Sequence, residues 1–132
     1  MTTFRARSVF CGEVAPGVIG VLMAEGESGE GARVELKRSI TFDDQDRALG
    51  QDTHCLGLHT GASVYGGVTG WALTPGRLTL ELSKEATEAL AVGAELTMEF
   101  DAQLVDDLEE WLPKVLDTAH GDRPPLRRST PR

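Results

Sequence analysis

The sequence predicts an α+β fold, in which a mostly antiparallel β-sheet is packed by two helices from the C-terminal half of the chain. Short segments alternate apolar and polar residues, which is typical of half-buried strands in an antiparallel sheet. Turn signals such as Pro16-Gly17 and Pro75-Gly76 lie between these segments. The strands precede the longest helical pattern in the chain, an order that favours α+β over a wound parallel sheet.

The first third of the chain is predicted to form strands. We expect them at residues 3–14, 18–24 and 32–42. The second strand is a continuous apolar run that ends at a loop rich in glycine and glutamate, residues 25–31. The third alternates, with Val34, Leu36 and Ile40 separated by polar or charged residues. Two consecutive strands joined by a flexible loop indicate a hairpin.

A break in the strand pattern at residues 43–52 (DDQDRALGQD) predicts a short helical turn. Asp43 or Asp44 would cap its first residue, and Gly50 would end it. Strands then resume, and we expect them at residues 54–59, 63–68, 71–73, 78–82 and 96–100. The alternation is clearest in residues 78–82, where leucine occupies every second position.

Two helices are predicted in the C-terminal half. The first has Ser83 as its N-cap, apolar residues at helical spacing, and Gly93 as its stop signal. The second follows the last strand, and one side of it carries Leu104, Leu108, Trp111, Leu112, Val115 and Leu116. Pro113 lies inside this pattern, so we expect it to kink the helix or divide it.

Residues 1–120 are expected to form one domain, because 132 residues is a usual chain length for a single hydrophobic core. Residues 121–132 (GDRPPLRRSTPR) hold much proline and arginine and little apolar content, so we expect a disordered basic tail. No segment resembles a membrane span or a signal peptide. We therefore expect a cytoplasmic protein whose Cys11 and Cys55 are free thiols.

The charge of the chain is strongly negative and unevenly distributed. The formal net charge is -8, although residues 122–132 hold four arginines and one aspartate. The remainder has nine Lys and Arg residues against twenty Asp and Glu residues. Such a charge repels nucleic acid and attracts basic protein surfaces, so we expect a basic protein partner and no nucleic acid. Solubility alone is the other explanation of this charge.

Three groups of residues resemble catalytic or metal sites but lack the required spacing. His54, Cys55 and His59 are close in sequence, yet neighbouring residues of a strand point to opposite faces, so one metal ion could not easily bind both His54 and Cys55. On a strand, Cys55 and His59 would lie roughly 13 Å apart, too far for direct proton transfer. The aspartates of residues 43–52 lack the twelve-residue ligand pattern of an EF-hand. We predict no catalytic residues, no metal and no cofactor.

The aspartates of residues 43–52 and the aromatic side chains each have two interpretations. The aspartates are either solvated turn and capping residues or a patch that recognises a basic partner. Trp71 and Trp111 are either binding anchors or core residues, and the small number of aromatic residues in the chain favours the core.

The order of four motifs resembles the bacterial immunity protein 10 family. The motifs are Asp43-Asp44, LGQDTHC at 49–55, ASVYGGVTGW at 62–71 and LTLELSKEATEAL at 78–90. The most specific residues are Gly50, Asp52, Thr53, Cys55, Tyr65, Gly66, Gly67, Val68 and Trp71. Before the cysteine, where the family pattern often has tyrosine, this chain has His54. The resemblance covers residues 32–100.

The resemblance implies a toxin-neutralising immunity protein of a polymorphic toxin system, which binds its cognate toxin domain stoichiometrically and is not an enzyme. The acidic composition suits a basic toxin such as a nuclease. The residues expected to contact the partner are Asp43, Asp44, Asp46, Gln51, Asp52, Tyr65 and Trp71.

Two other functions remain open at this stage. One is a small-ligand or regulatory binding domain, with a pocket formed by the sheet and the Gly66-Gly67 segment. The other is an enzyme that uses Cys55, His59 and the acidic loop. Whichever function applies, an exposed edge strand would permit a homodimer.

Overall fold

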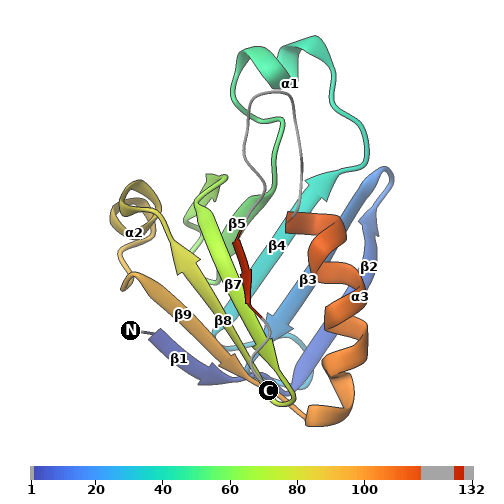
Figure 1. Cartoon of the computed structure of the whole chain (residues 1–132), viewed down its shortest axis with the longest axis vertical. Helices are drawn as coiled ribbons and strands as arrows, with labels where there is room; N and C mark the ends of the chain where they lie inside the picture. Colours follow the sequence, from blue (N-terminus) through green and yellow to red (C-terminus); the bar gives the residue numbers. More distant parts are fainter. Residues whose placement is uncertain (1, 117–126, 130–132) are drawn as a thin grey trace.

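The strands form two five-stranded sheets (Figure 1), described here from a computed structural model that covers residues 2–116 and 127–129. Sheet I contains, in spatial order, β1 (Thr2–Arg5), β9 (Glu95–Glu99), β8 (Arg77–Leu82), β7 (Val68–Thr74) and β10 (Arg127–Ser129). Sheet II contains β2 (Ser8–Ala15), β3 (Val18–Ala24), β4 (Arg33–Ser39), β5 (Cys55–Leu58) and β6 (Ser63–Tyr65). The prediction of an α+β, mostly antiparallel fold is confirmed. The strands are divided between two sheets, whereas the sequence indicated one.

Sheet II is an antiparallel meander in which each strand pairs with the next one along the chain. In sheet I, β7, β8 and β9 are antiparallel, while the edge strands β1 and β10 run parallel to their neighbours. The strand predicted at residues 18–24 has the bounds of β3, and the predicted hairpin with the next strand is formed.

The chain passes between the sheets at two corners where the sequence indicated continuous strands. At the first corner, the amide of Ala6 donates to the carbonyl of Glu99 in sheet I (2.6 Å), and the next amide, of Arg7, donates to Ala24 in sheet II (2.9 Å). The strand predicted at 3–14 is therefore two strands, β1 and β2. At the second corner, Gly66 and Gly67 divide the segment predicted at 63–68 into β6 and β7.

The helices are α1 (Asp44–Ala48), α2 (Lys84–Leu90) and α3 (Val105–Leu116), which a 3₁₀ turn, η1 (Ala102–Leu104), precedes. Ser83 caps α2 as predicted, accepting from the amide of Ala86 (3.1 Å). The predicted stop at Gly93 is wrong, because Ala91 adopts the left-handed conformation and ends the helix earlier. α3 runs through Pro113 undivided, and the exposed side of the helix carries Glu109, four residues before the proline.

One hydrophobic core lies between the two sheets, and α3 closes one side of it. α3 contacts β2, β3 and β4 of sheet II and β7 of sheet I (Figure 1). Trp71, Leu80 and Leu108 are among its fully buried side chains. The guanidinium of Arg38, at the end of β4, donates to the carbonyl of Lys114 (3.0 Å) and so satisfies a terminal carbonyl of α3.

The predicted basic tail falls mostly outside the described residues. Of residues 121–132, only Arg127–Ser129 are described, and they form β10 beside β7. Among the described helices, none is long and apolar enough to cross a membrane.

Candidate functional site

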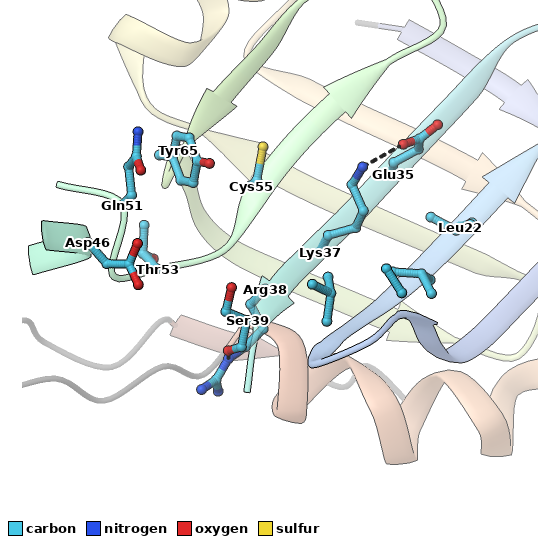
Figure 2. Close-up of a pocket in the computed structure, with 13 residues that line it drawn as sticks. Leu22, Glu35, Lys37, Arg38, Ser39, Asp46, Gln51, Thr53, Cys55 and Tyr65 are labelled. Atoms are coloured by element: carbon cyan, nitrogen blue, oxygen red, sulfur yellow. Dashed lines mark hydrogen bonds and ion pairs between the residues drawn. The ribbon is translucent and has the colours of Figure 1, made fainter. Parts of the chain in front are cut away.

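The outer face of sheet II carries a groove with a volume of about 490 Å³ (Figure 2). Side chains of β3 and β4 line its floor, among them Leu22, Glu35 and Lys37, and the segment after α1 and the strand β6 line the opposite side. Asp46, Gln51 and Tyr65, which the sequence analysis selected as partner contacts, all line it. The groove therefore brings together predicted residues from α1, the following loop and a separate strand.

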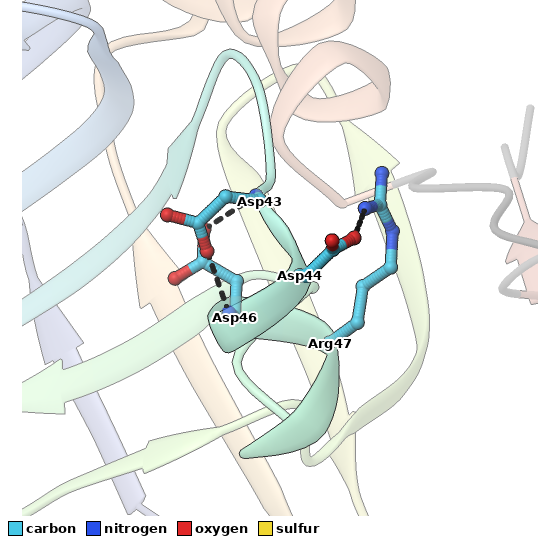
Figure 3. Close-up of polar contacts among 4 residues, drawn as sticks. All are labelled: Asp43, Asp44, Asp46 and Arg47. Atoms are coloured by element: carbon cyan, nitrogen blue, oxygen red, sulfur yellow. Dashed lines mark hydrogen bonds and ion pairs between the residues drawn. The ribbon is translucent and has the colours of Figure 1, made fainter.

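The helix α1 projects from one end of the molecule and buries none of its side chains (Figure 1). Its start is fixed by a reciprocal capping box: the amide of Asp46 donates to Asp43 (2.7 Å), and the amide of Asp43 donates to Asp46 (3.0 Å) (Figure 3). Asp44 forms an ion pair with Arg47 (3.2 Å). No ion pair between described residues neutralises Asp43 or Asp46, so α1 presents two uncompensated carboxylates beside the groove.

The buried side chain of His54, 2% exposed, anchors the loop after α1 to the corner between the sheets. Its Nε2 accepts from the amide of Val68 (3.3 Å), and its carbonyl accepts from the amide of Gly66 (2.7 Å). Since Nε2 accepts, the neutral ring carries its proton on Nδ1, which lies 3.4 Å from Oγ1 of Thr53. The two motifs at 49–55 and 62–71 are thus in direct contact.

Gly66 and Gly67 make this corner because both have positive φ values, 73° and 92°. A Cβ at Gly67 would lie 2.8 Å from the Cβ of Ala86 in α2. The carbonyl of Gly67 also accepts from the amide of Ser83, the N-cap of α2 (2.8 Å). The corner therefore requires glycine for both its conformation and its close packing against α2.

The floor of the groove is polar along β4. Glu35 forms ion pairs with Arg33 (2.6 Å) and Lys37 (3.1 Å). Burial opposes its ionisation, but the hydrogen bonds and positive charges of Lys37 and Arg33 outweigh burial, so the pKa of the Glu35 carboxyl lies below its ordinary value. This carboxylate is already neutralised, unlike those of Asp43 and Asp46.

The residues of the catalytic alternative do not form one site. Cys55 lines the groove on the outer face of sheet II, whereas His59 lines a second cavity, of about 390 Å³. Burial, with a contribution from Glu35, raises the pKa of the Cys55 thiol. Burial, together with Asp107 and Glu110, raises the pKa of Cys11 to about 11. Both shifts are opposite to those of an activated thiol nucleophile.

No group of three or more His, Cys, Asp or Glu side chains within the described ranges is arranged to hold a metal ion. The second cavity is apolar and lies near β1, β5 and the end of α2, with Phe4, Leu58 and Val92 among its lining residues. Gly66 and Gly67, where the small-ligand alternative placed a pocket, line neither this cavity nor the groove.

Four of the seven predicted contact residues do not line the groove, namely Asp43 and Asp44 at the start of α1, Asp52 and Trp71. Trp71 is 1% exposed and packs in the core, where no partner protein can reach it in this structure. Asp52 is half-buried between Gln51 and Thr53, which both line the groove, but Asp52 itself does not. Sequence reasoning missed the apolar lining residues Val14, Val18 and Leu22. Their signal was present in residues 18–24, an apolar run on both faces of the strand.

Residues 5–108 match the family model described as Immunity protein 10. No curated protein and no solved structure matches the chain. The family match is longer than the motif region at 32–100 and includes α1, the groove and both corners between the sheets.

Proposed function

Because the chain belongs to the immunity protein 10 family, we propose that it neutralises a cognate toxin domain by stoichiometric binding, in the cytoplasm of the bacterium that makes the toxin. In this function the protein blocks its partner and performs no catalysis. The toxin would be part of a polymorphic toxin system, in which antidote and toxin are encoded side by side.

The observation that carries this proposal is the position of the contact residues that the sequence predicted. Asp46, Gln51 and Tyr65 are far apart in the chain or in different elements, yet they line one groove. Asp43 and Asp44 lie at the start of the same short helix as Asp46. Tyr65 is 49% exposed although it is a large aromatic side chain. Exposed aromatic residues beside a cavity are typical of protein interfaces.

The charge of the molecule indicates the chemistry of the toxin surface. The formal net charge is -8, and Asp43 and Asp46 have no cation within the described residues. A basic toxin surface complements these carboxylates and accelerates association through long-range attraction. Nucleases are basic toxins of this kind, because they bind phosphate backbones.

The test is a binding titration between this protein and the purified toxin domain encoded by the neighbouring gene, at low and at physiological salt. We expect tight binding that weakens as salt increases. Replacing Asp43 and Asp46 together with asparagine should weaken binding at low salt by about tenfold and reduce its salt dependence. Asp101→Asn, which removes a carboxylate outside the groove, is the matched control. Absence of binding at micromolar concentration would refute the proposed function.

The alternative of a small-ligand binding domain has one supporting observation, the apolar cavity of about 390 Å³. A metabolite that copurifies with the protein, or a metabolite that raises its melting temperature reproducibly, would favour this alternative.

A further inference from the structure

The two sheets differ in the chemistry of their outer faces. On sheet I the outward side chains are polar, as shown by Thr74, Thr79 and the ion pair between Arg77 and Glu99 (3.4 Å). On sheet II they include an apolar set, Phe10, Val14, Val18, Leu22 and Tyr65. Both outer faces are exposed to the same solvent. A requirement for solubility would favour polar side chains on both faces and therefore does not explain the apolar set on sheet II.

The strand β3 has the composition of a strand that is covered on both sides. Its sequence, VIGVLMA, contains no polar side chain, whereas β8, RLTLEL, alternates. Inward residues Val21 and Met23 are 0% and 1% exposed in the core, while outward residues Val18 and Leu22 are only half-buried. Continuous apolar strands are typical of sheets with both faces packed. Val18 and Leu22 both line the groove on the outer side of β3.

Gly20, between Val18 and Leu22 along the outer face, shapes the centre of the groove region. A Cβ there would lie 2.8 Å from the carbonyl oxygen of Leu36, 3.1 Å from Cγ of Lys37 and 3.2 Å from a methyl carbon of Val14. Neighbouring side chains therefore already lie against this glycine. The result is a shallow apolar surface, with Val14, Val18 and Leu22 bordering the groove.

The uncompensated carboxylates of this surface lie on its α1 side. On β4, Glu35 is paired with both Arg33 and Lys37, which leaves one positive charge in surplus there, and Asp44 is paired with Arg47. Asp43 and Asp46 have no cation among the described residues. Asp46 lines the groove opposite Leu22 of β3 (Figure 2), and Asp43 is hydrogen-bonded to Asp46 at the start of α1 (Figure 3). The surface thus has an apolar part over β3 and an acidic part at α1.

We propose that the outer face of sheet II is the surface that binds the toxin domain. An apolar part of the toxin packs over Val14, Val18 and Leu22, and a basic side chain of the toxin pairs with Asp46 and Asp43. This inference rests on the proposed function and specifies the surface and the chemistry of the partner. A second copy of this chain fits less well, because each copy has a net charge of -8 and two copies therefore repel one another.

The test compares three variants in titrations with the purified toxin domain encoded by the neighbouring gene. Val18→Thr with Leu22→Thr keeps strand-forming side chains and removes apolar contact. We expect about tenfold to hundredfold weaker binding, mainly through faster dissociation, with the salt dependence unchanged. Asp43→Asn with Asp46→Asn should instead reduce the salt dependence. Thr74→Ser with Thr79→Ser, at outward positions of sheet I, is the matched control and should bind as the wild type does.

A second measurement uses the wild-type protein and does not depend on how the variants fold. Cys55 lines the groove, whereas Cys11 lies beside α3, near Asp107 and Glu110. Bound toxin domain should slow the alkylation of Cys55 at alkaline pH at least fivefold more than that of Cys11, as measured by mass spectrometry of peptides.

The outcomes separate the two proposals. If the toxin domain binds tightly, but the Val18/Leu22 variant binds equally tightly and Cys55 stays unprotected, then the surface is wrong and the proposed function stands. If the wild type does not bind the toxin domain, both proposals fail. If the Val18/Leu22 variant loses only a self-association seen by light scattering, the face is a contact between copies of this chain, and the toxin assignment is overturned.

Discussion

His54 is a buried polar residue whose hydrogen bonds connect the site to the scaffold. It accepts the amide of Val68 at the start of β7 and the amide of Gly66 at the corner, and it follows directly on the loop that lines the groove. In the sequence, its proximity to Cys55 and His59 suggested a metal site, which the spacing did not favour. In the structure it has a different role. Its ring nitrogen accepts from the amide of Val68 at the point where the chain passes from sheet II to sheet I, in place of a backbone carbonyl.

This role predicts that stability depends on the acceptor that His54 supplies. His54→Leu leaves the buried amide of Val68 without that acceptor and should lower the free energy of unfolding by about 1–3 kcal/mol. His54→Gln keeps a side-chain acceptor and should lose less, as measured by urea unfolding. Equal losses in the two variants would show that the hydrogen bond to Val68 does not stabilise the corner.

A second residue-scale prediction concerns Gly67. Gly67 and Gly61 share a φ of 92°, but a Cβ at Gly61 meets nothing within 4 Å, whereas one at Gly67 meets Ala86 at 2.8 Å. Gly61→Ala should therefore lower the free energy of unfolding by about 1 kcal/mol, because only the positive φ is unfavourable for alanine there. Gly67→Ala adds a steric clash with Ala86 and should lower the free energy of unfolding, measured in urea, by about 2–4 kcal/mol. Equal losses would mean that α2 moves aside freely and that the corner is not tightly packed.

At the scale of elements, α1 is held by its own capping interactions and contributes nothing to the core. Its five residues include no buried side chain, and the side-chain hydrogen bonds of Asp43, Asp44 and Asp46 all lie within residues 43–47. An isolated helix of this length is not stable in water, so the capping box and the anchored loop after it must fix its geometry.

The capping box gives a prediction that separates geometry from charge. Asp43→Ala removes both the cap and a carboxylate, while Asp43→Ser removes the carboxylate and keeps an acceptor for the amide of Asp46. The loss of a cap costs about 1 kcal/mol, so hydrogen exchange of the α1 amides should be about fivefold faster in the alanine variant than in the serine variant. Global stability should change little in either, since α1 buries no side chain. Equal exchange rates in both variants would show that the cap does not hold α1.

Elements with strong local signals were predictable from the sequence, and their assembly was not. The apolar run of β3, the alternation in β8 and the N-caps Asp43 and Ser83 each depend on neighbouring residues only, and all four are confirmed. The division into two sheets depends on hydrogen bonds between distant segments, such as that from Ala6 to Glu99. Periodicity within residues 3–14 contains no information about that partner.

The same limit applies to the candidate site. Asp46, Gln51 and Tyr65 were identified from charge and motif order, and they do share a groove. Trp71 was selected because of its residue type, but the strand pairing of β7 turns it inward. The outward apolar residues Val18 and Leu22 were missed. A run such as VIGVLMA does not reveal which of its residues face outward until its pairing with β2 and β4 is known.

At the scale of the whole molecule, both sheets and α3 share one core, and the acidic groups lie outside it. Buried Leu108, Leu112 and Val115 join α3 to inward side chains of both sheets. Each side of the core therefore depends on the others, and we expect one cooperative unfolding transition, with α1 as the exception that opens locally. The electrostatic attraction of a partner can then change without loss of the fold, because the charges that produce it are solvent-exposed.

The absence of buried side chains in α1 has an evolutionary consequence. A residue that packs in a core is constrained by the volumes of its neighbours, and substitution there is selected against whatever the protein binds. Residues 45–48 are free of that constraint, so their sequence can diverge among relatives while the glycine corner stays fixed. Members of the family should accordingly resemble one another more at Gly66 and Gly67 than at the α1 residues that follow Asp43-Asp44.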